Sequence, residues 1–167
     1  VRAGGDLWEV PKVYHANAWV LMRKGDGYEW LEGFKLKKPV GYGMCVSTDK
    51  GVVCIGGQTG ETVYSNVFRL EWDAKTKTLK QSELPALPVA CTGGAAAVIG
   101  DVVYVAGGQS EAGLDTATKN FWRLDLTAKE PEWEKLPSWP GPARAFNQMV
   151  AQHNGREMCL YVFGGRR

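Results

Sequence analysis

The sequence predicts an all-β fold built from repeated four-stranded antiparallel sheets, and three observations support it. A Gly-Gly pair recurs at residues 4–5, 56–57, 107–108 and 164–165, at intervals of 52, 51 and 57 residues. Short apolar runs precede the last three pairs: Val-Val-Cys-Ile, Val-Tyr-Val-Ala and Leu-Tyr-Val-Phe. Four short strand-like runs, divided by turn residues, fill each period, and no stretch keeps a helical periodicity of about 3.6 residues. Each period therefore corresponds to one sheet.

A period near 50 residues with one glycine pair per unit is typical of kelch-type β-propeller blades. Glycine suits a strand end that needs positive φ or close approach of a neighbouring backbone. No Gly-x-Gly-x-x-Gly or P-loop spacing opens a helix here, so we interpret the pairs as packing devices and not as phosphate cradles.

Each unit repeats one order of elements, in which a polar loop follows the glycine pair and a proline-bearing loop closes the unit. The third and fourth strands of each blade are expected at residues 18–22, 28–34, 67–72, 78–84, 121–126 and 132–136. With strands named a to d from the inside out, the chain reads cd, abcd, abcd, ab.

These boundaries divide the chain into about three blades' worth of strands. Residues 1–42 hold strands c and d of a first blade, 43–84 and 93–136 form full blades, and 145–167 hold strands a and b of a last blade. Closed propellers have about four to eight blades, so we interpret the chain as half of a six-bladed propeller. Missing blades or a second copy would complete it, and the size in solution distinguishes the two.

Composition excludes several classes of protein. The 167 residues are 44% hydrophobic and 23% charged, which predicts a globular, soluble chain with no membrane span. A net charge of +2 argues against a nucleic-acid partner. The chain has no Cys-x-x-Cys pair and no His/Cys cluster, so we expect no metal. Cys45 and Cys54 flank a hairpin turn and are expected to be cross-strand neighbours, either bonded or free.

Propeller geometry places the b-to-c and d-to-a loops on one face, around the channel, where ligands bind. Aligning the loop prolines puts Arg144 where the other units carry Ala90 and Gly41. A guanidinium there suits an anionic group, because its fork matches a carboxylate. The alternative is an exposed arginine, or one paired with an acid of a neighbouring blade.

Other polar residues complete the candidate site. Asn147 and Gln148 follow Arg144 in the innermost strand, where alternation sends one of them toward the channel. His15 is included because histidine transfers protons near neutral pH. The alternative for most loop residues is a solvated side chain. The predicted ligand-binding set is Arg144, Asn147, Gln148, Gln58, Gln109, Glu111 and His15.

Three stretches resemble a known family. The segments Lys12-Val-Tyr-His-Ala-Asn-Ala-Trp-Val-Leu and Val40-Gly-Tyr-Gly-Met-Cys-Val-Ser are similar to bacterial N-acetylneuraminate epimerases, the sialic acid mutarotases. The stretch from Trp133 through Pro140-Gly-Pro-Ala-Arg144 to Tyr161-Val-Phe-Gly-Gly165 resembles the first blades of those enzymes. In this chain the usual C-terminal blade of those enzymes comes before their usual N-terminal blade. This order resembles the cyclically permuted mutarotase branch.

The resemblance implies an isomerase that interconverts the α and β anomers of a sialic acid by acid/base ring opening, with neither metal nor cofactor. Arg144 would hold the substrate carboxylate, and Asn147 or Gln148 would position hydroxyls. The proposed catalytic glutamate of the family, in a Gly-Glu segment followed closely by an arginine, has no match among these 167 residues. The catalytic residues are therefore unknown, and the main acid/base pair is expected outside this chain.

The chain begins without an initiator methionine or a signal-peptide pattern, so the true N-terminus is expected to be missing. The family resemblance alone points to the periplasm. A non-catalytic kelch module for protein or glycan binding remains the alternative function, since kelch blades serve both uses. A copper radical oxidase would need tyrosine, cysteine and histidine ligands on the rim, which the sequence does not support.

Overall fold

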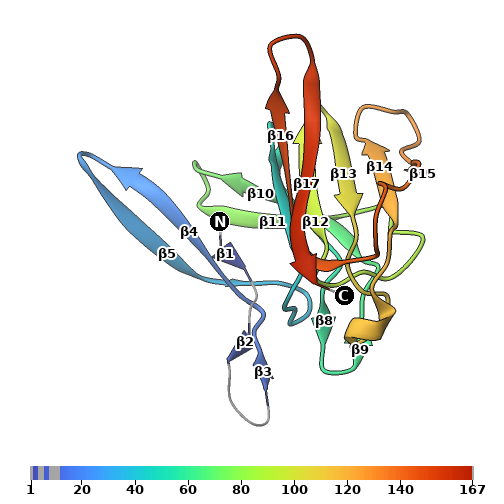
Figure 1. Ribbon diagram of the computed structural model, residues 1–167. Helices are drawn as coiled ribbons and strands as arrows, with labels where there is room; N and C mark the ends of the chain where they lie inside the picture. Colours follow the sequence, from blue (N-terminus) through green and yellow to red (C-terminus); the bar gives the residue numbers. More distant parts are fainter. Residues whose placement is uncertain (1, 4–5, 8–11, 167) are drawn as a thin grey trace.

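In the part of the chain that the structure describes, four main antiparallel sheets follow one another along the sequence (Figure 1). The structure is a computed structural model that describes residues 2–3, 6–7 and 12–166, so the predicted pair Gly4-Gly5 lies outside it. The first sheet contains β1 (Arg2–Ala3), β4 (Asn17–Lys24) and β5 (Gly27–Lys35), and the second contains β6 (Met44–Thr48), β7 (Gly51–Ile55), β10 (Val67–Asp73) and β11 (Thr78–Leu84). The third sheet contains β12 (Ala95–Ile99), β13 (Val102–Ala106), β14 (Phe121–Asp125) and β15 (Trp133–Lys135), and the fourth contains β16 (Ala145–His153) and β17 (Met158–Arg166). The predicted all-β fold of four-stranded antiparallel blades is confirmed.

Several short elements are not among the predicted strands. The strand β1 adds a third member to the first sheet, where Ala3 pairs with Ala18. The b-to-c loops contain two small hairpins and one helical turn: β2 (Asp6–Leu7) with β3 (Val13–Tyr14), β8 (Gln58–Thr59) with β9 (Thr62–Val63), and η1 (Leu114–Thr116). Figure 1 shows these three loops at the lower end of the view. No helix of the described residues has the length and apolar character that crossing a bilayer requires.

The strand β7 is apolar because neighbouring sheets cover both of its faces, whereas β6 is covered mainly on one face. In β6, Met44 and Val46 are buried while Cys45 is exposed, so burial alternates with the pleat. In β7, by contrast, both Val53 and Cys54 are buried. The predicted cross-strand pairing of Cys45 with Cys54 is confirmed by the register of β6 and β7.

The largest core lies between the second and third sheets. Met44, Ile55 and Val67 come from the second sheet, and Val103 and Leu124 come from the third. Burying one such side chain contributes about 1.5–3 kcal/mol of hydrophobic free energy. The two complete blades are therefore held together mainly by this core.

Smaller cores form the other two seams. Phe34 packs edge-on against Trp72, with ring centroids 5.5 Å apart, where the first sheet meets the second. The hairpin β4–β5 otherwise extends away from the other sheets (Figure 1). Between the third and fourth sheets, Ala95 and Ala97 pack with Met149. Their small side chains let β12 lie directly between β6 and β16, which brings the innermost strands together.

The glycine pairs connect consecutive blades. Gly56 has φ +59°, and a Cβ there would lie 2.1 Å from the carbonyl oxygen of Cys91. The amide of Gly57 donates to that same oxygen at 2.8 Å, and the amide of Gly108 donates to the carbonyl of Arg144 at 3.0 Å. Both contacts join one blade to the next, so the structure supports the packing interpretation of the pairs.

Candidate ligand site at the channel mouth

A cavity of about 680 Å³ opens where loops of all four sheets meet. We call it the mouth. Its lining residues are Lys12, Tyr14, Tyr42, Gln58, Gly60, Glu61, Gln109, Ala112, Gly113, Phe146 and Arg166. Because they come from the first to the last sheet, the mouth lies where the innermost strands converge, as expected for a propeller ligand site.

Three equivalent backbone positions frame the mouth. Tyr42, Gly93 and Phe146 precede β6, β12 and β16 closely, or begin them, and have φ angles of 56°, 59° and 55°. The amide of Gly93 donates to the carbonyl of Tyr42 at 2.9 Å, and the amide of Phe146 donates to that of Gly93 at 2.6 Å. A left-handed backbone at a bulky residue costs about 1–3 kcal/mol and is often found at ligand sites. The strain is borne here by two aromatic residues.

The two rings lie together because the residue between them has no side chain. Tyr42 and Phe146 form an edge-to-face pair with centroids 6.3 Å apart and planes at 85°. A Cβ on Gly93 would lie 3.1 Å from Cε1 of Phe146, closer than carbon atoms normally approach. Glycine at this position therefore leaves room for the phenyl ring.

Each ring of the pair has a cation beside it. The Nζ atom of Lys12 donates to the hydroxyl of Tyr42 at 2.6 Å and lies 4.9 Å from the ring centroid. Because the ammonium is much closer to the oxygen than to the ring centre, a hydrogen bond is the main contact. The guanidinium of Arg166 lies 5.0 Å from the centroid of Phe146, a cation–π distance. The mouth thus presents a row of cation, ring, ring and cation.

Arg166 occupies a repeated position, directly after a glycine pair. The bridges that define this position are Gly41 with Gln58, Thr92 with Gln109, and Ala145 with Arg166. Two blades therefore carry a glutamine where the last carries an arginine. The predicted set includes the two glutamines but omits Arg166, although the residue following each Gly-Gly pair is a signal that the sequence contains.

Of four loop residues in the predicted set, two line the mouth and two do not. Gln58 and Gln109 line it, and Gln109 is buried. His15 and Glu111 are not among the lining residues. The carbonyl of His15 accepts from the amide of Val40 at 3.3 Å, and the carbonyl of Glu111 accepts from the hydroxyl of Thr116 at 2.9 Å. Their backbones shape loops next to the mouth.

The proline-based alignment of Arg144 is wrong. The amide of Arg144 donates to Thr118, and its carbonyl accepts from Gly108. The amide of Cys91 donates to Tyr64, and its carbonyl accepts from Gly57 in the same pattern. Arg144 therefore corresponds to Cys91, not to Ala90, because the loops carry different numbers of residues between the proline and the strand.

The side chain of Arg144 supports its own blade. Its Nη1 atom donates to the carbonyl of Gly164 at 2.9 Å. Arg144 and Arg166 line a separate cavity of about 340 Å³ beside this glycine pair. Arg166, and not Arg144, is thus the arginine that the described mouth contains.

Asn147 and Gln148 lie on opposite faces of β16. Asn147 is 2% exposed, and its Nδ2 atom donates to the carbonyl of Ala106 in the third sheet at 3.2 Å. Gln148 is exposed on the other face, next to Phe163 of β17. The prediction that one of them faces the channel is wrong, because the two faces of a blade point toward neighbouring blades. Asn147 joins the third and fourth sheets.

The thiols lie away from the mouth, and the structure has Cys45 and Cys54 as free cysteines. Their sulfurs are 3.5 Å apart, and the hydrogen bond between them lowers the pKa of Cys45 and raises that of Cys54. Burial raises the pKa of the Cys91 thiol to about 12. Within the described residues, no three His, Cys, Asp or Glu side chains are grouped closely enough to hold a metal ion.

Comparison with known proteins gives one motif match and several partial relatives. Residues 90–138 match the kelch motif. N-acetylneuraminate epimerases are 42% identical over 82 residues in Haemophilus influenzae (strain PittEE) and 44% identical over 85 residues in Pasteurella multocida (strain Pm70). These matches cover 48% and 50% of this chain and 19% of each epimerase. The chain therefore spans about a fifth of their length.

Two longer matches have lower identity. Adagio-like protein 1 of Oryza sativa subsp. japonica is 28% identical over 154 residues, which are 89% of this chain and 24% of that protein. A solved structure of a fungal alcohol oxidase of the AA5 family, in complex with copper, superimposes with a TM-score of 0.67 at 16% identity. The matched region covers 81% of this chain and 30% of the oxidase chain. At that identity the likeness shows the fold alone.

Proposed function

Since this chain consists of kelch-type β-propeller blades, we propose that the complete propeller is an N-acetylneuraminate epimerase to which this chain supplies part of the site. Such an isomerase interconverts the α and β anomers of a sialic acid. The match to epimerases over half of the chain supports this proposal. The observation that carries it is the row of two cations and two aromatic rings in the mouth.

The chemistry of the mouth suits a sugar acid. The guanidinium of Arg166 can bind a carboxylate through two parallel hydrogen bonds. The faces of Tyr42 and Phe146 can pack against the apolar C–H face of a sugar ring. The amide groups of Gln58 and Gln109 supply both donors and acceptors for hydroxyl groups. Anomer exchange then requires proton transfers and a ring opening, which the mouth can host.

Anomer exchange by the full-length protein tests this proposal. Freshly dissolved N-acetylneuraminate is followed by proton NMR, and we expect the anomer ratio to reach equilibrium faster with protein than in buffer. Arg166→Gln should raise KM, because it removes the charge that faces the carboxylate. A rate equal to that in buffer would exclude the epimerase.

We also propose a periplasmic location, which cell fractionation tests.

A non-catalytic kelch module is the second candidate. The match to Adagio-like protein 1 favours it, because that match covers more of this chain than the epimerase matches do. This candidate expects sialic acid or a protein partner to bind without any acceleration of anomer exchange. Equilibrium binding, measured beside the NMR assay, separates the two candidates.

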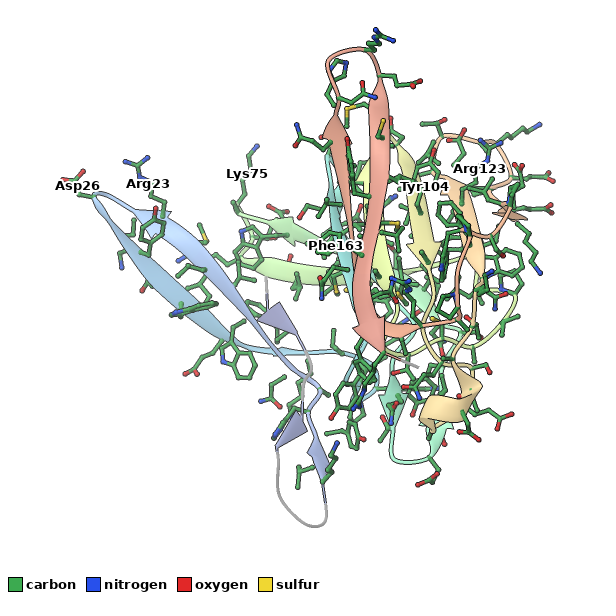
Figure 2. The ribbon with its side chains drawn as sticks, in the orientation of Figure 1. Arg23, Asp26, Lys75, Tyr104, Arg123 and Phe163 are labelled. Carbon is green, nitrogen blue, oxygen red and sulfur yellow. The ribbon has the colours of Figure 1, made fainter. Side chains whose placement is uncertain are left out.

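We further propose that additional strands complete the ring. On β17, Tyr161 and Phe163 are 44% and 50% exposed, and Figure 2 shows Phe163 and Tyr104 on opposite sides of this strand. The corresponding face of a complete blade packs against its neighbour. Either further blades or a second copy would cover this face. Sedimentation of the full-length protein tells a monomeric ring from a paired one.

A further inference from the structure

Gln109 is a polar residue that lines the mouth although only 5% of it is exposed. Thr92 and Asn147 are also polar and buried, and each donates a side-chain hydrogen bond to a carbonyl of a neighbouring blade. Within the residues that the structure describes, the side-chain amide of Gln109 has no hydrogen-bond partner. A buried amide without a partner lowers stability, so native proteins rarely keep one without a use. Its position in the mouth makes a bound ligand the candidate partner.

The equivalent glutamine of the preceding blade is used differently. Gln58 and Gln109 occupy the same repeated position, since Gln58 forms an isolated bridge with Gly41 and Gln109 forms one with Thr92. The Nε2 atom of Gln58 donates to the carbonyl of Gly60 at 3.1 Å, within its own loop. The amide of Gln58 therefore helps to hold its loop, whereas, among the described contacts, both donors and the acceptor of Gln109 remain available to a ligand.

Backbone contacts fix where the side chain of Gln109 begins. The backbone amide of Gln109 donates to the carbonyl of Thr92 at 2.8 Å, and the backbone amide of Thr92 donates to the carbonyl of Gln109 at 3.0 Å. The loop that follows is held by Thr116, whose hydroxyl donates to the carbonyl of Gly113 at 2.6 Å. Ala112 and Gly113 of this loop also line the mouth, so a small apolar side chain accompanies the buried amide there. A binding group that is held in this way is preorganised.

Resting on the proposed function, we propose that Gln109 binds the acetamido group of the sialic acid, so that the mouth selects N-acetylated sugar acids. A carboxamide carries one acceptor oxygen and two N–H donors. The N–H and the carbonyl of an acetamido group match this acceptor and one of these donors, which gives two hydrogen bonds in one contact. The methyl group of the acetamido can pack against Ala112. A hydroxyl group offers only one oxygen to Gln109 and no methyl group to Ala112, so it fits this position less well.

Gln109 and Arg166 occupy the same repeated position in successive blades, and both line the mouth. A guanidinium binds a carboxylate through its planar fork, whereas a carboxamide can both donate to and accept from a neutral amide. A sialic acid carries one carboxylate and one acetamido group. Two neighbouring blades therefore supply one complementary group for each, and the pair determines the orientation of the sugar in the mouth.

The test measures kcat and KM of anomer exchange by NMR for two sugars, with the full-length protein and its Gln109→Met variant. The sugars are N-acetylneuraminate and its deaminated analogue, in which a hydroxyl group replaces the acetamido group. The parent should prefer N-acetylneuraminate by about 10- to 100-fold in kcat/KM, because the analogue leaves part of the buried amide unpaired. Methionine is unbranched but has no amide, so the variant should lose this preference, mainly through a higher KM for N-acetylneuraminate.

Gln58→Met is the matched control, because it removes the equivalent amide in the preceding blade, where the structure has it bonded to Gly60. This variant should lower kcat/KM for both sugars by the same factor and so keep the preference of the parent. A purely structural role of Gln109 would likewise change the two sugars alike. The preference between the sugars is therefore the readout that separates binding by Gln109 from support of the fold.

The outcomes separate this inference from the proposed function. If the parent accelerates exchange but has equal kcat/KM for both sugars, or if Gln109→Met keeps the preference of the parent, the inference is overturned and the epimerase remains. If the parent does not accelerate exchange, the epimerase is overturned, and titration calorimetry of both sugars decides the inference. A preference in Kd that the parent shows and Gln109→Met loses would then support it, and any other result would overturn it.

A second variant covers a failure of the first to fold. Should Gln109→Met lose the folded circular dichroism spectrum of the parent, Gln109→Glu decides. Glutamate keeps the size of the side chain and its acceptor oxygen but has no N–H donors. It should therefore lower the preference for N-acetylneuraminate, and an unchanged preference would overturn the inference.

Discussion

Arg144 and Cys91 occupy the same place in successive blades, and each donates a side-chain hydrogen bond to the first carbonyl of its own blade's glycine pair. The guanidinium reaches the carbonyl of Gly164 at 2.9 Å, and the thiol reaches that of Gly107 at 3.4 Å. Two unrelated side chains thus support the same glycine turn. The correspondence explains why an arginine beside the channel faces its own blade and not the mouth.

Replacing Arg144 with alanine should reduce stability more than ligand binding. Loss of a hydrogen bond from a partly exposed charged group lowers the free energy of unfolding by about 1–2 kcal/mol. Urea unfolding of the full-length protein measures this, with Arg166→Ala as the comparison that weakens binding of sialic acid. Equal stability combined with weaker binding in Arg144→Ala would return Arg144 to the ligand site.

Gly93→Ala should disturb the mouth, and Gly100→Ala provides the matched control. Both glycines have left-handed backbones, with φ +59° and +58°, so the backbone cost of alanine is similar, about 1 kcal/mol. At Gly93 the new Cβ would also meet the ring of Phe146 at 3.1 Å, whereas nothing lies within 4 Å at Gly100. Only Gly93→Ala should therefore weaken sialic acid binding, as measured by titration calorimetry. Equal effects of the two variants would show that the ring position is unimportant.

Cys45 should react with iodoacetamide much faster than Cys91. The hydrogen bond with Cys54 lowers the pKa of Cys45, which raises its thiolate fraction at neutral pH. Burial raises the pKa of Cys91 to about 12, so almost no thiolate is present there. Peptide mass spectrometry of the labelled native protein follows both sites. Cys54→Ala, which removes the hydrogen bond, should slow the labelling of Cys45, and faster labelling of Cys91 than of Cys45 would contradict the arrangement.

Asp73 and Asp125 should make the c-to-d turns sensitive to acid. Asp73 accepts the backbone amide of Lys75 at 2.8 Å. Asp125 accepts the hydroxyl of Thr127 at 2.7 Å and the backbone amide of the same residue at 2.8 Å, and these bonds lower the pKa values of both carboxyls below the usual 3.8. A lowered folded-state pKa adds stability above the unfolded value, and this is lost as the pH falls through the folded value. Asp125→Asn should thus be less stable than the parent at neutral pH and equal to it in strong acid. A stability difference that is the same at both pH values would contradict this.

The fold could be predicted from the sequence because its signals are local. A glycine pair, an apolar run and a turn lie within a few residues of one another, and each blade repeats them. Hence strands such as β11, at Thr78–Leu84, match the predicted residues. The strand β1, at Arg2–Ala3, is too short to leave a periodic pattern.

The site was harder to predict because its parts come from different blades. Tyr42 and Phe146 are 104 positions apart in the sequence, and hydrogen bonds through Gly93 bring them together. Prolines gave the wrong correspondence for Arg144, since loops of unequal length reach the same backbone position. The alternation rule wrongly sent one of Asn147 and Gln148 toward the channel, because alternation selects a face of the sheet, and in a propeller neither face is the channel.

The backbone hydrogen bonds that join Tyr42, Gly93 and Phe146 determine how the residues around the mouth can vary. Each blade contributes one residue at the same height, and the backbone hydrogen bonds that fix this height do not depend on the side chain. Exchanging the residue in a single blade would therefore alter what the channel recognises while the scaffold stays unchanged. Ligand recognition in this architecture can therefore be varied one blade at a time.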